Sequence, residues 1–302
     1  MVPAATASSD PPLLPGEAEL RAFAETAALL LTERRPRASG TPAATRRPGV
    51  GLHHLDHRDY QSGDELRHID WRQTARARRP IVRRFEAESV ADWTILLDAS
   101  SSMALPDAAK WRAAVRAAAA LSYALLHIGH RVGLIAFGAR VLAERRRGRG
   151  RQQYAAIART LTELQPAARG ERSALGGCAR HLHGATSVFA ISDFLAADEM
   201  RDELAALRQH CAELHALQLA GAVETRLAAA GEFDLVDVET GARLPARVDA
   251  AEQVQAARAR AAMTARLRAY CLRSGIAFSN WDVVQAWQHA LVRHLVQARA
   301  RC

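Results

Sequence analysis

Two acidic residues in this sequence come directly after short apolar segments. Asp98 ends "TILLD" and precedes three serines, and Asp193 follows "VFAIS". Carboxylate and hydroxyl oxygens are the ligands that Mg²⁺ prefers, and Mg²⁺ keeps several of its waters. Ser100 and Ser102 stand at alternate positions, so their hydroxyls can face the same point, and Ser101 is expected to be dispensable. We predict a site for Mg²⁺, or another divalent cation such as Mn²⁺, that leaves a position open for a partner's acidic group.

The segments around these residues alternate between strand and helix patterns. Apolar runs of strand length are followed by longer stretches with helical spacing, which is typical of βαβ units and a mostly parallel sheet with helices on both faces. In such sheets, ligands lie beyond the carboxyl ends of the strands, where the strand order reverses. The two carboxylates are therefore expected to meet at one edge. The predicted strands are 92–98, 131–138, 186–194 and 212–220, and the predicted helices are 106–129, 152–164, 174–182 and 197–210.

The flanking sequence differs in style from this α/β pattern. The chain starts with a Pro-, Ala- and Ser-rich stretch, and a later stretch before residue 52 is rich in Pro, Gly, Ser and Thr. We predict a disordered leader, then an N-terminal helix, linker and small β-containing subdomain, then the α/β domain with a hairpin, and a C-terminal helical segment with one short strand. The predicted boundaries are 1–18, 19–89, 90–248 and 249–302.

Composition restricts the location and the class of protein. No uninterrupted apolar run of transmembrane length and no signal peptide are recognised, and the four cysteines lie far apart without a CxxC pair, so we expect a cytoplasmic protein without a zinc ribbon. The net charge is +9, but Lys110 is the only lysine in an Arg- and Ala-rich chain, a bias typical of coding composition. The runs "ARARRPIVRR" and "ERRRGRGR" keep a nucleic-acid-binding adaptor open as an alternative.

Other interpretations compete at the predicted cation site. The serines can cap the helix that follows them, and Asp98 can be a strand-end residue that accepts hydrogen bonds from backbone amides. Asp98 and Asp193 can also belong to a metal-dependent phosphoester hydrolase. A phosphatase of the haloacid-dehalogenase type needs a second aspartate two residues after its nucleophile, where this chain has Ser100. A serine hydrolase needs Gly-x-Ser-x-Gly, which is absent at this position.

The pattern Asp-x-Ser-x-Ser at the end of an apolar strand resembles the metal-ion-dependent adhesion site of von Willebrand factor A domains. In that family, an aspartate from a third loop and a threonine from a second loop complete the site. Asp193 matches the aspartate, and the stretch "GERSALGGCARHL" offers Ser173 in place of the threonine, which departs from the family pattern. The resemblance implies a von Willebrand factor A-like, doubly wound α/β fold. It also implies a metal held by Asp98, Ser100, Ser102, Ser173 and Asp193.

A second resemblance lies upstream. The stretch "YQSGDELRHIDWRQTARARRPIVRRFEAES" closely resembles the signature of a bacterial family, domain of unknown function 58. The resemblance implies a partnership with MoxR-type AAA+ ATPases in chaperone-like remodelling or complex maturation. Two interpretations of the signature stay open: it staples the small subdomain onto the α/β domain, with its tryptophan as an apolar anchor, or it docks the ATPase. The residues concerned are Gly63, Asp64, Arg67, Asp70, Trp71 and Arg76.

The stretch "HHLDHRD" places His53, His54 and His57 close together. Such a cluster invites a zinc assignment, but the family pattern has no metal ligands there, so we interpret it as an exposed strand or turn. The sequence as a whole predicts a non-enzymatic, metal-dependent protein-interaction module. Its expected cofactor is Mg²⁺, and its expected partner is a MoxR-type ATPase or a protein client.

Overall fold

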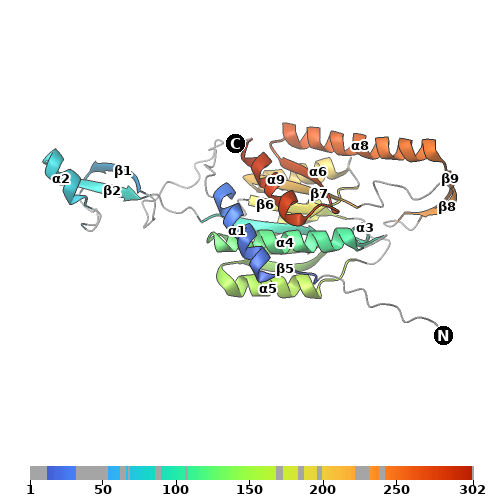
Figure 1. Cartoon of the computed structure of the whole chain (residues 1–302), viewed down its shortest axis with the longest axis horizontal. Coiled ribbons are helices and arrows are strands. Elements are labelled where there is room, and N and C mark those ends of the chain that lie inside the picture. The colour runs from blue at the N-terminus through green and yellow to red at the C-terminus, as the bar shows by residue number, and fades with distance from the viewer. Residues whose placement is uncertain are drawn as a thin grey trace. The chain divides into compact units, whose positions relative to one another are not determined.

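The computed structural model divides the chain into two compact units (Figure 1). The first contains residues 1–34 and 91–302, and the second contains residues 35–90. The structure describes residues 12–31, 54–61, 66, 69–85, 90–105, 108–167, 173–182, 187–195, 199–221, 231–237 and 242–300.

Six strands of the first unit form one sheet among the described residues. All neighbouring strands are parallel except β4 and β5, which pair antiparallel. The central strands are buried along nearly their whole length, as expected when helices cover both faces. The prediction of an α/β fold with a mostly parallel sheet is therefore confirmed. The order is β10 (Ala277–Asp282), β7 (Glu213–Ala220), β6 (Ser187–Ser192), β3 (Asp92–Asp98), β4 (Arg131–Phe137) and β5 (Val141–Gly148).

Alternate side chains of β3 enter two separate cores, one on each face of the sheet. Ile95 and Leu97 belong to one core and Leu96 to the other, because successive side chains of a strand point to opposite faces. The first core is closed by α1 (Glu17–Leu31), α4 (Ala109–His127), α5 (Gly150–Glu163) and α9 (Trp287–Arg299). The second is closed by η2 (Leu175–His181), α6 (Glu199–His210) and α8 (Ala250–Arg273).

The direction of the strand order reverses between β3 and β6. From β3 the chain proceeds outward through β4 to β5, and from β6 it proceeds the opposite way through β7 to β10. The carboxyl ends of β3 and β6 therefore lie side by side at the switch point, which is where open α/β sheets bind ligands. The short helix α3 (Ser101–Ala104) begins directly after β3 at this edge.

Described segments near both termini pack into the first unit. Helix α1 packs against α4 and α9, so it belongs with the sheet and is separate from the signature region with which it was expected to be grouped. Leu13 and Leu14, within the predicted leader, already pack against the first core. The predicted C-terminal segment contributes β10 to the sheet. The expected hairpin consists of β8 (Gly231–Val236) and β9 (Arg243–Val248), and Asp249 then caps α8 in a capping box with Glu252.

The second unit combines a two-stranded antiparallel sheet with one short helix. Strand β1 (His54–Asp59) pairs with β2 (Ile81–Phe85), and α2 (Trp71–Ala77) lies between them in sequence. Asp70 caps α2, because its Oδ1 accepts hydrogen bonds from the amides of Arg72 and Gln73 at 3.0 and 3.1 Å. Across both units, no helix in the described ranges is long and apolar enough to cross a membrane.

Candidate functional site

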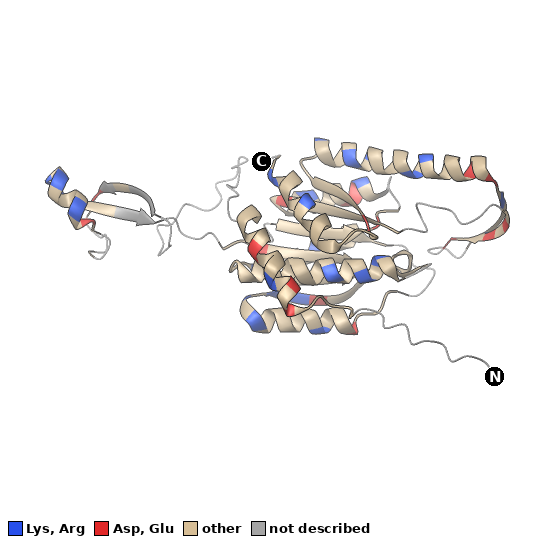
Figure 2. Cartoon of the chain, viewed as in Figure 1, with Lys and Arg blue, Asp and Glu red and all other residues tan. Residues whose placement is uncertain are grey.

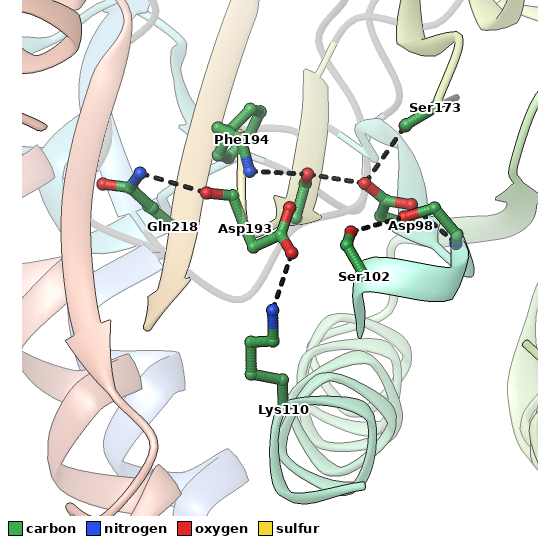
Figure 3. A network of polar contacts seen from close by, with 9 residues as sticks. Asp98, Ser102, Lys110, Ser173, Asp193, Phe194 and Gln218 are labelled. Carbon is green, nitrogen blue, oxygen red and sulfur yellow. Dashed lines mark hydrogen bonds and ion pairs between the residues drawn. The ribbon is translucent and has the colours of Figure 1, made fainter. Parts of the chain in front are cut away.

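The residues predicted for the cation site come together at the switch point (Figure 3). Asp98 is the last residue of β3, and Asp193 follows the last residue of β6 directly. Both carboxylates and the hydroxyls of Ser100 and Ser102 are buried, with at most 2% of each residue exposed. The fifth predicted residue, Ser173, reaches the same cluster from the segment before η2.

The Asp98 carboxylate accepts hydrogen bonds from three separate segments. Its Oδ2 atom accepts from the Ser192 hydroxyl at 2.6 Å and from the Ser173 hydroxyl at 3.1 Å. Its Oδ1 atom accepts from the backbone amide of Ser100 at 2.9 Å. Ser192 is not among the predicted site residues, although it directly precedes Asp193 and carries the shortest of these bonds. Asp98 is thus the centre on which the hydroxyls converge.

The serines after β3 do more than start a helix. Ser100 occupies the residue before α3, but its side chain makes no capping hydrogen bond there. Its Oγ lies 3.1 Å from the Oγ of Ser102 instead, so the alternate hydroxyls do face one point as their spacing predicts. The interpretation of Ser100 as a simple helix cap is therefore wrong. Ser101 is also buried, within α3.

Asp193 is paired with a lysine that the sequence pattern does not place in the site. The Nζ of Lys110, in the first turn of α4, donates to Asp193 Oδ2 at 2.8 Å, and only 2–3% of either side chain is exposed. The signal available in the sequence was that Lys110 is the only lysine among many arginines. The site therefore contains a cationic group of its own.

The turn after β6 is held by two further hydrogen bonds. Phe194 has a φ of 48°, a left-handed conformation that is uncommon for a residue other than glycine, and its amide donates to Ser192 Oγ at 2.9 Å. Gln218 of β7 donates its Nε2 to the carbonyl of Asp193 at 3.1 Å. The Oε1 of Gln218 is buried and has no hydrogen-bond partner among the described residues. This turn directs the Asp193 carboxylate toward Lys110 (Figure 3).

The surroundings of Asp98 disfavour the ionised form of its carboxylate. Burial first, and the nearby Asp193 second, raise the pKa of Asp98 from 3.8 to about 6, although hydrogen bonds from Ser192 and Ser100 act in the opposite direction. With both carboxylates ionised and Lys110 protonated, these three groups carry one net negative charge. A bound cation would favour the ionised form of Asp98.

The donor set fits a hard cation better than a zinc-type ion. The candidate ligands are two carboxylates and three hydroxyls, all of them oxygen. Within the described parts of the chain, no group of three or more His, Cys, Asp or Glu side chains is placed to hold a metal. Cys178 is buried near Asp98, and burial raises the pKa of its thiol to about 12, which keeps it protonated and a poor ligand. Mg²⁺, which uses few protein carboxylates, suits this arrangement.

The signature residues are only partly described. Gly63, Asp64 and Arg67 lie outside the described residues, as does His53. Asp70 caps α2, and its Oδ2 lies 3.0 Å from His57 Nε2, so His57 has a carboxylate partner in the second unit.

Two signature side chains of α2 point away from the core of the second unit. Trp71 is 70% exposed, and Arg76 is exposed in the last turn of α2. Within the described part of the second unit, Trp71 therefore does not pack into an apolar core.

Basic residues of the first unit are spread over several elements. Figure 2 shows them along α4, α5 and α8, and β5 carries three consecutive arginines, Arg145–Arg147. Two of the three have partners: Arg145 donates to Thr160 at 2.6 Å, and Arg147 lies 3.6 Å from Asp92. The run "ERRRGRGR" is thus in part a structural strand.

Comparisons with known proteins give the family of the chain. An uncharacterised protein of Mycobacterium tuberculosis and one of Mycobacterium bovis are each 30% identical over 260 residues, which is 83% of this chain and 81% of theirs. Among solved structures, a conserved hypothetical protein BatB from Bacteroides thetaiotaomicron matches 70% of this chain and all of its own, with a TM-score of 0.40 and 16% identity. An aerotolerance-related membrane protein from Bacteroides fragilis matches 68% of this chain and 98% of its own, with a TM-score of 0.38 and 15% identity. Residues 56–268 match the model of a protein family of unknown function, DUF58, and the chain belongs to that family.

Proposed function

We propose that this protein is a metal-dependent protein-interaction module with a von Willebrand factor A-like cation site. The observation that carries the proposal is the convergence of two buried carboxylates and three serine hydroxyls at the switch point of the sheet. Asp98, Ser100, Ser102 and Asp193 would hold Mg²⁺ or Mn²⁺, and Ser173 would support Asp98 or join them. The metal would supply a coordination position for a carboxylate of a partner protein.

The residues of this chain have distinct tasks in the proposal. Asp98 provides the negative charge that attracts the cation, and the hydroxyls of Ser173 and Ser192 fix its Oδ2. Ser100 and Ser102 add neutral oxygens, which leave the bound ion with positive charge to share with an acidic ligand. Asp193 adds the second carboxylate and is positioned by the turn at Phe194.

The proposed partner is a MoxR-type AAA+ ATPase, or a protein that this ATPase remodels. Support comes from the resemblance of the signature block and from the exposed Trp71 on α2, which offers an aromatic contact of the kind that dominates many interfaces. A Trp71→Ala variant is expected to keep its fold and to bind the ATPase more weakly. If the variant binds equally well, α2 is not a docking surface.

The metal-binding step is tested with Asp98→Ala. Calorimetric titration should give Mg²⁺ binding to the wild type and a loss of at least about tenfold in the variant, because removing a ligand charge in a buried site is worth more than about 1.4 kcal/mol. Asp202→Ala, which removes an exposed aspartate of α6, is the matched control. A pull-down of the ATPase with Mg²⁺ and with a chelator follows. Unchanged Mg²⁺ dependence in the Asp98→Ala variant would contradict the mechanism.

Hydrolysis of phosphoesters is the rival at the same residues. The interaction module is preferred because Ser100 stands where a haloacid-dehalogenase-type nucleophile motif has its second aspartate. The Ser100 hydroxyl, which lies 3.1 Å from the Ser102 hydroxyl, is neutral and cannot replace that carboxylate as a general acid or base. Turnover of p-nitrophenyl phosphate by the wild type with Mg²⁺, lost in Asp98→Ala, would favour the rival instead.

A further inference from the structure

Lys110 is unusual both in the sequence and in its surroundings. It is the only lysine of the chain, it is 2% exposed, and its ammonium lies 2.8 Å from a carboxylate oxygen of Asp193. It projects from the first turn of α4 toward the edge where β3 and β6 end (Figure 3). A buried ammonium needs a close anionic partner, so Lys110 and Asp193 stay together in the metal-free protein.

The charge of the site depends strongly on this lysine. With Lys110 present, the two carboxylates and the ammonium carry one net negative charge, and a divalent cation changes this to one net positive charge. One further carboxylate then makes the loaded site neutral. Without Lys110, the divalent cation alone would neutralise Asp98 and Asp193, and an added carboxylate would leave the site negative. In a buried site these differences are large, because charges are weakly screened there.

We propose that Lys110 couples metal binding to the binding of a partner carboxylate; this rests on the proposed function of the site. The ammonium opposes the cation when the cation binds alone, since both are positive and both are drawn to Asp193. It favours the complete assembly of cation and carboxylate. Each ligand therefore strengthens the binding of the other, as linkage requires. The site would then bind the cation more tightly when an acidic partner is bound as well.

Three variants separate this role from a purely structural ion pair. Lys110→Gln removes the charge but keeps a donor for Asp193 Oδ2, Lys110→Met removes both, and Lys110→Arg keeps the charge. If Lys110→Met fails to fold, Lys110→Gln still carries the test, since its amide can occupy the same hydrogen bond. Circular dichroism establishes folding before any titration.

The experiment measures Mg²⁺ affinity by calorimetry in sodium acetate and in sodium chloride of equal ionic strength. In the wild type, acetate should raise the affinity for Mg²⁺ by at least about threefold over chloride. In Lys110→Gln, the affinity for Mg²⁺ in chloride should rise by at least about tenfold, because a charge interaction in a buried site is large. Acetate should then add nothing. Lys110→Arg should behave like the wild type.

The outcomes distinguish the two proposals. If the wild type binds no Mg²⁺ in either salt, the metal site itself is absent and both proposals fall. If the wild type binds Mg²⁺ but Lys110→Gln has the same affinity and the same response to acetate, the metal site stands and the coupling role of Lys110 is overturned. Tighter binding by Lys110→Gln in chloride, with the acetate response lost, supports the coupling.

Discussion

Replacing Asp98 with asparagine should remove a pH-dependent loss of stability from the metal-free protein. Burial, and then the neighbouring Asp193, raise the pKa of Asp98 from 3.8 to about 6 in the folded state. The folded protein therefore holds this proton more tightly than the unfolded chain does between these two values. Because the folded state binds more protons in that range, the contribution of Asp98 to stability falls as the pH rises from about 4 to about 6.

The expected size follows from the difference between the two pKa values. Each pKa unit is worth about 1.4 kcal/mol, so ionised Asp98 destabilises the metal-free fold by on the order of 3 kcal/mol above pH 6. Asparagine has no such charge. It keeps an acceptor for the Ser100 amide, but its amide nitrogen cannot accept from the hydroxyls of Ser173 and Ser192. That change costs about 1 kcal/mol at every pH. It therefore lowers the free energy of unfolding of the variant by the same amount across the pH range and does not alter its pH dependence.

The assay is urea unfolding with a chelator present, at intervals from pH 4 to pH 7.5, for the wild type, Asp98→Asn and the exposed-site control Asp202→Asn. The free energy of unfolding of Asp98→Asn relative to the wild type should increase by on the order of 3 kcal/mol across this range. The control should follow the wild type. Mg²⁺ at about 100 times its dissociation constant should then stabilise the wild type by about 2.7 kcal/mol at pH 7 and leave Asp98→Asn unchanged. Parallel pH curves for the wild type and Asp98→Asn would refute the reasoning.

Four further substitutions test the alternate serines, the cap of α2 and a buried histidine. Ser102→Ala should weaken Mg²⁺ binding by about tenfold, whereas Ser101→Ala should leave it unchanged, and equal effects in calorimetry would contradict the alternate spacing. Asp70→Ala should destabilise α2 by about 1–2 kcal/mol through loss of its N-cap, seen as faster hydrogen exchange at residues 71–77 and not in the sheet. His294 of α9 is buried and makes hydrogen bonds of 2.7 Å with the Ser279 hydroxyl and 2.9 Å with His215. His294→Ala removes both bonds and leaves a cavity, so urea unfolding should show a loss of about 2–4 kcal/mol; a loss below about 1 kcal/mol would contradict a stabilising role for these two bonds.

The sheet and much of the candidate site follow from local sequence patterns. The apolar strands separated by helices predict a mostly parallel sheet, and the acid at the end of each of two strands predicts that Asp98 and Asp193 meet. The alternate serines predict that Ser100 and Ser102 face one another, and their hydroxyls lie 3.1 Å apart. Each of these inferences uses only the periodicity of a strand and the common direction of parallel strands.

The remaining site residues could not be predicted because their positions depend on packing between distant elements. Lys110 reaches Asp193 because the first turn of α4 lies beside the carboxyl end of β6, and nothing in the helical pattern of α4 marks one of its buried positions as polar. Gln218 contacts the Asp193 carbonyl because β7 neighbours β6, an order that sequence alone does not fix. In the second unit, the aromatic type of Trp71 favours burial, but the short α2 leaves it exposed.

The polar cluster at the switch point is difficult to explain as a device for stability. Buried carboxylates destabilise a fold unless they are fully compensated, and apolar side chains of similar volume would often be at least as stable in their place. Here three donors reach Asp98 and one ammonium reaches Asp193, yet the pKa of Asp98 stays near 6, so compensation is incomplete in the metal-free protein. A cation bound at this edge would stabilise the same ionised form that burial penalises. The arrangement that is unfavourable without a ligand thus becomes favourable with one, which is the property expected of a binding site and not of a core.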